Sequence, residues 1–279
     1  LILKAAANDN FSFEDGAHIR DGYVHSLSQT AGLRVDERAY TACIVYLNGN
    51  YWGVYELREK VDDPDFLDYY YDQDEQWVNS PNYIQYLATW GGTNTEYGAP
   101  NAQPDWDTFK NWVLSNPMSN QANYQIAKSQ YNTGSLIDYF LINMYTVCMD
   151  WLNWNTSWWR GMDPNGDKKK WRYTLWDMDA TFGHYINYTN IPNTTPTADP
   201  CDPSSLNDPG GQGHVPIWNE MLTNQEFFDD YINRWSDMKN TYFSCSYMIF
   251  HLDSLINIID PEMQGQINKW GGGTYADWL

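Results

Sequence analysis

Residues 150–183 carry the pattern that most constrains the fold of this chain. Asp150 is followed five residues later by Asn155, and two strand-like runs rich in Trp and Arg then flank the turn sequence DPNGD. Proline, asparagine and glycine supply the backbone angles of a tight turn, so the two runs predict a β-hairpin. The second run ends in WDMD, which contains Asp177 and Asp179. The hairpin is therefore expected to bring two carboxylates back towards Asp150 and Asn155.

Two carboxylates and an amide at one place favour a hard cation. Mg²⁺ prefers oxygen ligands and binds through one or two carboxylates together with phosphate oxygens. We therefore predict a Mg²⁺ site formed by Asp177, Asp179 and Asn155. The alternative interpretation is structural: Asp150 and Asn155 only stabilise a turn after a buried helix, and the WDMD acids only end a strand, as these residue types often do.

The spacing of Asp150 and Asn155 also has a precedent in catalysis. It is D-x₄-N, the spacing of the protein-kinase catalytic loop, in which the Asp orients the attacking hydroxyl and the Asn holds a metal ion. A later Asp, followed by a glycine-bearing turn, provides the second metal contact in that template, and Asp177 or Asp179 precedes such a turn here. D-x₄-N alone is a weak signal, and the hairpin with WDMDATFG after it makes the pattern more specific.

The charge of the chain argues against nucleic acid and anionic lipid as main partners. The 279 residues include 36 acids against 16 Lys and Arg, a formal net charge of -20. Such a chain repels polyanions unless a metal ion or a local basic group compensates. The hydrophobic content of 42 % indicates a globular chain with a substantial core. No run approaches the roughly 18 apolar residues of a membrane span, so no span is expected in this segment.

Residues 40–60 give the clearest strand signal. Two β-branched and aromatic runs flank an Asn-Gly dipeptide, the strongest short hairpin signal. Alternation along the second run places Tyr55 and Leu57 on the face expected to point to the core, and Glu59 continues that face. A buried carboxylate needs a partner, so Glu59 is a candidate site residue, with a solvated strand end as the alternative.

Helices are expected on both sides of these strands. Apolar spacing predicts a helix from Ile19 that Gly32 ends, with Arg20 near its start as either a solvated side chain or an anion ligand. Residues 61–109 contain no Lys or Arg; a helix starts at the Pro-initiated acidic turn there, and residues 90–107 have the composition of a loop. Residues 135–149 are apolar nearly all round and predict a central buried helix.

The remaining segments are read from composition. Residues 186–216 form a long loop rich in Pro, Asn and Thr, and amphipathic helices follow from residue 217 onward. The four cysteines show no CxxC pair, which argues against structural zinc. Cys43 and Cys148 are expected to be buried thiols, while the sequence leaves a disulfide between Cys201 and Cys245 open. The chain opens without Met in mid-pattern, as a mature or trimmed segment would.

An ordered set of motifs resembles the CotH family, named for a spore coat protein and related to atypical secreted protein kinases. The similar segments are LKAAANDN with the helix after it, YLNGNYWGVYELREKVD, the Asp150–Asn155 segment, Trp159-Arg160, LWDMDATFG, and VPIWNEMLTNQEFFDDYINRW. Together they cover roughly residues 1–270, and WDxD followed by Gly is the most specific of them.

The resemblance implies an α+β, two-lobed kinase-like fold in a single domain. Residues 1–62 would be part of a small N-lobe that lacks further N-terminal strands. Residues 63–279 would be a larger helical C-lobe that contains the 150–183 hairpin. It also implies ATP and Mg²⁺ as cofactors, phosphorylation of protein Ser/Thr, and a secreted, periplasmic or cell-surface location.

Site residues follow from the same resemblance. Asp150 and Asn155 would be catalytic, and Asp177, Asp179 and Asn155 would bind metal. The implied cofactor-binding residues are Arg20, Glu59, Lys60 and Arg160. Arg160 stands where many family members have Lys, and arginine keeps the charge but not the shape of that side chain.

Two other functions stay open. Exposed Trp and Tyr, for example in WGGTNTEYG, would suit a glycan-binding or cell-surface module, because aromatic rings stack on sugars. A non-catalytic structural domain on the same fold is the other. Nucleotide binding would separate the kinase-like function from both of them.

Overall fold

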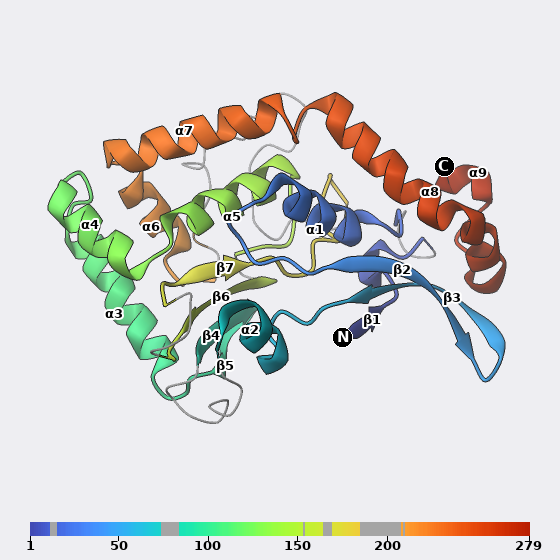
Figure 1. The fold of residues 1–279 in the computed structure, drawn as a ribbon, viewed down its shortest axis with the longest axis horizontal. Helices are drawn as coiled ribbons and strands as arrows, with labels where there is room; N and C mark the ends of the chain where they lie inside the picture. The colour runs from blue at the N-terminus through green and yellow to red at the C-terminus, as the bar shows by residue number, and fades with distance from the viewer. Residues whose placement is uncertain (12–15, 74–83, 153, 164–168, 185–207, 209) are drawn as a thin grey trace.

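The computed structural model describes residues 1–11, 16–73, 84–152, 154–163, 169–184, 208 and 210–279. The fold is mixed α+β, with two small antiparallel sheets and many helices (Figure 1). The strands are β1 (Ile2–Lys4), β2 (Tyr40–Leu47), β3 (Asn50–Arg58), β4 (Ile84–Trp90), β5 (Gly92–Tyr97), β6 (Thr156–Gly161) and β7 (Arg172–Thr174). The helices are α1 (Arg20–Ala31), α2 (Pro64–Tyr71), α3 (Ala102–Ser115), α4 (Gln121–Gln130), α5 (Thr133–Tyr145), α6 (His214–Met221), α7 (Gln225–Asn240), α8 (Cys245–Trp270) and α9 (Tyr275–Trp278).

The first sheet has the order β1-β3-β2, and the second has the order β5-β4-β6-β7. The segment between α1 and β2 connects them, because Asp36 exchanges backbone hydrogen bonds with the end of β7: Leu175 N–H donates to Asp36 O at 2.7 Å, and Asp36 N–H donates to Tyr173 O at 3.1 Å. Helices α1 and α5 pack on the sheets, and α7 and α8 form an outer layer over them (Figure 1).

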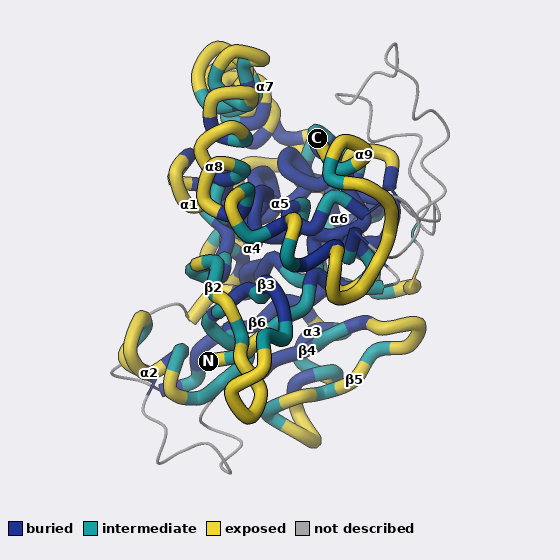
Figure 2. The backbone as a smooth tube through the Cα atoms, turned by 90° about the vertical axis from the view of Figure 1, so that its right-hand side faces the viewer, coloured by how far each residue is buried: buried dark blue, intermediate teal, exposed yellow. Residues whose placement is uncertain are grey.

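The core lies around α5 and the strands that it covers. Residues 133–144 of α5 are all buried, as the apolar run predicted. Figure 2 shows the same distribution, with buried backbone in the interior and exposed residues along the outer helices. No helix within the described residues is long and apolar enough to cross a membrane.

Several local predictions from the sequence are confirmed. Helix α1 ends at Gly32, whose φ of 58° is the left-handed conformation that glycine adopts without strain. The Asn-Gly turn joins β2 to β3, and Asp63 caps α2 with Pro64 at its first turn. β6 and β7 pair antiparallel as the predicted 150–183 hairpin; most of its DPNGD turn lies outside the described residues.

Two local predictions were wrong. The buried face of β3 is formed by Val54, Glu56 and Arg58, whereas Tyr55 and Leu57 are only half-buried. Arg58 is accommodated there because it pairs with Asp21 of α1 and with Glu56 of its own strand. Residues 90–107 are not a loop but contain β5 and the start of α3, because Gly91, at φ 71°, allows a tight hairpin turn after β4.

The burial predicted for the cysteines is confirmed only in part. Cys148 is buried, but Cys43 in β2 is half-buried rather than buried. Cys245 is a free, exposed thiol at the start of α8, and Cys201 lies outside the described residues, as does most of the predicted loop over residues 186–216.

Candidate active site

Asp150 and Asn155 lie together in the turn between α5 and β6. The Asn155 side-chain amide donates a hydrogen bond of 2.9 Å to Asp150 Oδ2, and both residues are buried. The turn is held by Thr156, whose Oγ1 accepts a hydrogen bond of 2.6 Å from the Leu152 backbone. The D-x₄-N pair is therefore a fixed local unit.

Lys4 at the end of β1 reaches this region, and neither it nor its partner Asp21 was predicted from the sequence. Its ammonium group forms ion pairs with both Asp21 and Asp177. Burial alone would lower the pKa of Lys4, but Asp21 and then Asp177 raise it, so the lysine stays charged. The signal that existed in the sequence is a single Lys within a short apolar strand.

Asp21 of α1 connects three parts of the site. Its carboxylate pairs with Lys4 and Arg58, and its Oδ1 accepts a hydrogen bond of 2.7 Å from the Met178 backbone, between the two acids of WDMD. Burial raises the pKa of Asp21, but Arg58 and Lys4 outweigh it and hold that pKa well below its usual range. Helix α1 thus holds both the lysine and the 177–179 segment.

His25 lies one turn further along α1 and contacts the same carboxylate. Its Nδ1 accepts a hydrogen bond of 3.1 Å from the Arg38 backbone, and its Nε2 lies 3.3 Å from Asp21 Oδ1. Burial and the Arg58 charge lower the pKa of His25 to about 3, so the imidazole is neutral. With Nδ1 accepting, the ring proton is on Nε2, facing Asp21.

Asp179 is held from the opposite side by the loop after β1. Its Oδ2 accepts a hydrogen bond of 3.1 Å from the Asn8 backbone, and the Asn8 carbonyl oxygen contacts His184 Nε2 at 3.1 Å. Ala6 and Ala7 have φ values of 58° and 45°, a left-handed conformation that turns the loop towards Asp179.

The carboxylates raise one another's pKa. Burial, followed by the charge of Asp177, raises the pKa of Asp150 to about 6. Burial and then Asp177 also raise the pKa of Asp179, to about 8, against the lowering effect of Lys4. The site therefore contains more negative charge than its own lysine compensates, as expected where a cation binds.

These side chains fit a Mg²⁺ ion that takes most of its ligands from phosphate and water. Among the described residues, no group of three or more His, Cys, Asp or Glu side chains is arranged to hold a metal ion. A magnesium site needs only one or two carboxylates from the protein. Asp150 Oδ1 is buried without a hydrogen-bond partner, and Asn155 uses its amide nitrogen on Asp150, which leaves the amide oxygen available as a ligand.

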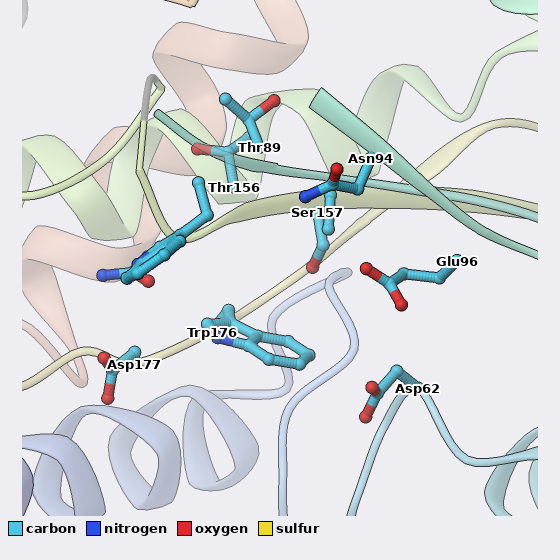
Figure 3. A pocket seen from close by; sticks show the side chains of 11 residues that line it. Asp62, Thr89, Asn94, Glu96, Thr156, Ser157, Trp176 and Asp177 are labelled. Atoms are coloured by element: carbon cyan, nitrogen blue, oxygen red, sulfur yellow. The ribbon is translucent and has the colours of Figure 1, made fainter. Parts of the chain in front are cut away.

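A cavity of about 370 Å³ opens beside these residues (Figure 3). Asn155 and Asp177 line one part of it, and the Trp176 side chain forms a wall. The other lining residues are Asp62, Ala88, Thr89, Trp90, Asn94, Glu96, Thr156 and Ser157. The cavity is large enough for a small ligand, and the part of its lining that the structure describes includes no lysine or arginine.

Strained backbone is concentrated around the same residues. Val147, Leu152, Asn155, Asp177 and Phe182 all have φ values between 48° and 68°, in the left-handed region. Such a conformation is rare for residues other than glycine, and for the β-branched Val147 it is an outlier. Strain of this kind persists only where surrounding contacts enforce it, and it is common at functional sites.

The other predicted cofactor residues lie elsewhere. Arg20 forms an ion pair with Asp9, whose carboxylate also accepts backbone hydrogen bonds from residues 17, 19 and 20. Glu59 accepts hydrogen bonds from the Ala39 backbone and the Tyr70 hydroxyl, and with Lys60 it lines a different cavity, near α2.

Arg160 is also separate from the Asp177 cavity. Its side chain donates to Gln85 at 2.7 Å and to Asp105 at 2.8 Å, and it lies over the Trp171 ring. The structure thus brings together Asp150, Asn155, Asp177 and Asp179 but not Arg20, Glu59, Lys60 or Arg160, whose proposed cofactor roles stay predictions.

A comparison with protein-family models shows which family the chain belongs to. Residues 2–278 match the family model described as CotH kinase protein. The chain belongs to the CotH family. The resemblance drawn from the sequence motifs is confirmed, and it covers nearly the whole chain, from β1 with Lys4 to α9. No match is found among curated proteins.

Proposed function

We propose that this CotH domain transfers the γ-phosphoryl group of ATP, with Mg²⁺, to a Ser or Thr hydroxyl of a protein. One observation carries the proposal: Lys4 pairs with both Asp21 and Asp177, beside the Asp150–Asn155 unit. In the protein-kinase template a strand lysine pairs with an acid on a helix, and the Asp and Asn of the catalytic loop and a later Asp complete the site. The same chemical groups follow in that order along this chain.

The proposed roles follow from charge and position. Lys4 would neutralise phosphate oxygens, as an ammonium group held by two carboxylates remains protonated. Asp177, Asp179 and the Asn155 amide oxygen would hold Mg²⁺, which supplies the positive charge that the cavity lining lacks. Most of the catalysis would then be positioning and electrostatic stabilisation of the transferring phosphoryl group.

Asp150 would orient the acceptor hydroxyl and accept its proton. Its pKa of about 6 is closer to neutral pH than that of an ordinary Asp, and its Oδ1 has no hydrogen-bond partner. Asn155 fixes the other carboxylate oxygen, so the free oxygen has a defined position.

The proposal extends to the architecture and the setting of the protein. The β1-β3-β2 sheet with α1 would form part of a small lobe, and the helices around α5 a larger one, with the site between them. A secreted, periplasmic or surface location and a protein acceptor are part of the same proposal. The charge of -20 supports an acceptor other than nucleic acid.

Nucleotide binding is the first test. Thermal unfolding would be measured with ATP, with Mg²⁺ and with both, on the wild-type protein and on Asp177→Asn. We expect stabilisation that needs both components, by about 2.7 kcal/mol when ATP is at 100 times its Kd. Asp177→Asn should lose this stabilisation, while Asp68→Asn, an exposed position on α2, should keep it. A wild-type protein that ATP and Mg²⁺ do not stabilise would contradict the proposal.

A second candidate, a glycan-binding module, is favoured by one observation. Trp90, which lines the cavity, is 69 % exposed. Its ring packs edge-on against that of Trp154, with the ring centroids 5.3 Å apart. An exposed indole can stack on a sugar ring. Glycan binding that survives Asp177→Asn but is lost in Trp90→Ala would support this module. Mg·ATP binding that is lost in Asp177→Asn but kept in Trp90→Ala would support the kinase-like function.

A further inference from the structure

The cavity at the candidate site has a second set of carboxylates, away from Asp177. Asp177 lies on one side of the Trp176 ring, and Asp62 and Glu96 lie on the other (Figure 3). Asp62 follows β3 closely, whereas Glu96 is in β5. Two strands from different sheets therefore bring acids to the same end of the cavity.

Asp62 is the more enclosed of the two. Its side chain is only 13 % exposed, and its Oδ1 is buried without a hydrogen-bond partner. Its Oδ2 lies 3.4 Å from the ammonium group of Lys60, whose side chain is 40 % exposed. An enclosed carboxylate oxygen with no donor is unfavourable in the free protein and is satisfied when a ligand supplies one.

Glu96 adds to the negative potential without closing the cavity. It lies in β5, the edge strand of its sheet, and its side chain is exposed. Among the described residues that line the cavity, none is a lysine or arginine. Two carboxylates at this end, with only one oxygen of Asp62 paired to Lys60, favour a ligand end that presents hydrogen-bond donors over one that presents phosphate oxygens.

The orientation of a nucleotide follows, if the proposed function holds. Its phosphates belong beside Lys4 and Asp177, where the ammonium group lies, so its base belongs at the opposite end of the cavity. Trp176 lies between the two ends and supplies an aromatic wall for a purine.

We propose that Asp62, assisted by Glu96, accepts a hydrogen bond from the exocyclic amino group of the base and so selects adenine. Hypoxanthine has a carbonyl oxygen where adenine has this amino group. Hypoxanthine would place this acceptor against the Asp62 carboxylate and leave Asp62 Oδ1 without a hydrogen-bond donor. The protein should therefore bind the inosine nucleotide less tightly. A site that hydrogen-bonds a donor group rejects an analogue without it more strongly than an apolar pocket rejects a change of size.

The test is equilibrium binding of Mg·ATP and Mg·ITP to the wild-type protein and to Asp62→Asn, Glu96→Gln and Asp68→Asn. We expect the wild-type protein to bind ATP at least about tenfold more tightly than ITP. Asp62→Asn should bring the ratio close to one, because an Asn amide can donate to the hypoxanthine carbonyl. Glu96→Gln should lower the ratio less. Asp68→Asn removes the same charge from exposed α2 and should leave the ratio unchanged.

Each contrary result has a separate meaning. Equal affinity for ATP and ITP in the wild-type protein, or a ratio that Asp62→Asn does not change, would overturn the role of Asp62 while leaving nucleotide binding intact. Tighter binding of GTP than of ATP would also overturn it, since guanine carries a carbonyl at the adenine amino position. Failure of every nucleotide to bind would overturn the proposed function itself.

Discussion

Lys4 and Asp177 form an ion pair although 173 positions separate them in the sequence. The pair joins the first strand of one sheet, β1, to the segment that follows β7 of the other sheet. Asp21, which pairs with the same lysine and receives the Met178 backbone N–H, makes this contact part of a three-element junction. The geometry of the candidate site therefore depends on how α1 packs.

Lys4→Met should reduce Mg·ATP-dependent phosphoryl transfer by on the order of 100-fold or more, because a charge that stabilises the transferring group is lost. Lys4→Arg should recover only part of the rate, because guanidinium differs in shape from ammonium. The rate would be measured at saturating ATP, with folding checked by circular dichroism. Lys128→Met, which removes a half-exposed lysine paired with Glu226, serves as the control, and an equal loss there would refute the prediction.

Arg20→Met should change stability more than nucleotide affinity. The guanidinium group pairs with Asp9 and so helps to hold the start of α1, rather than the Asp177 cavity. Without the guanidinium group, Asp9 keeps its backbone hydrogen-bond donors but loses its ion pair. We therefore expect the free energy of unfolding to fall by about 1–3 kcal/mol. Urea unfolding and an ATP titration on the same variant would measure both quantities. A Kd for ATP raised more than about tenfold, with unchanged stability, would restore Arg20 as a phosphate ligand.

Asp36→Ala should be among the most destabilising single substitutions. The buried carboxylate accepts hydrogen bonds from Arg172 Nε at 2.8 Å, from Trp159 Nε1 at 2.7 Å and from the Tyr71 hydroxyl. Removing it leaves a buried guanidinium without its partner, which costs about 3–5 kcal/mol.

The matched control for this prediction is Asp105→Ala. Asp105 also pairs with an arginine, Arg160, at 2.8 Å, but its side chain is 43 % exposed. An exposed pair contributes only about 0–1 kcal/mol. Equal losses in chemical unfolding for the two variants would show that the Asp36 network does not carry the expected stability.

Glu37→Gln should remove a pH dependence of stability. Burial, followed by the charge of Asp36, raises the pKa of Glu37 to about 8, and its Oε2 is buried without a partner. In the folded protein the Glu37 carboxyl keeps its proton up to about pH 8, whereas in the unfolded chain it loses that proton near its ordinary pKa of 4.5. The folded state thus binds more protons between these values, and stability falls as pH rises through this window.

The glutamine variant should unfold with a flatter dependence on pH. It should gain stability relative to the wild-type protein at pH 8 and above, by roughly 1–3 kcal/mol, because no charge has to be buried. Thermal unfolding at intervals from pH 4.5 to 9 measures the effect. A difference between the two proteins that is constant across this range would argue against a buried neutral Glu37.

Much of the local structure was predictable from the sequence. Turn chemistry located the β2–β3 hairpin and the end of α1 at Gly32, and the all-apolar run identified α5 as the buried helix. The D-x₄-N spacing and WDMD identified four of the residues that meet at the candidate site, because a hairpin between them fixes their proximity over a short stretch of chain.

The inward face of β3 was not predictable in the same way. Alternation gave the correct period, but it assigned the apolar side to the core, where Glu56 and Arg58 lie instead. The strand contains the Glu56–Arg58 pair, but the burial of Arg58 also depends on Asp21 of α1, and the sequence of one strand does not contain that partner.

The sequence by itself therefore determined the β2–β3 hairpin, the buried helix α5, the family and the acids of the 150–183 hairpin, which depend on residues close together in the chain. Only the tertiary structure decided that Lys4 and Asp21 belong to the site, that Arg20 and Arg160 pair elsewhere, and that Asp62 lines the cavity. The physical reason is that the energy of a buried charge is set by the partners the fold brings to it. Those partners come from strands and helices far apart in the sequence.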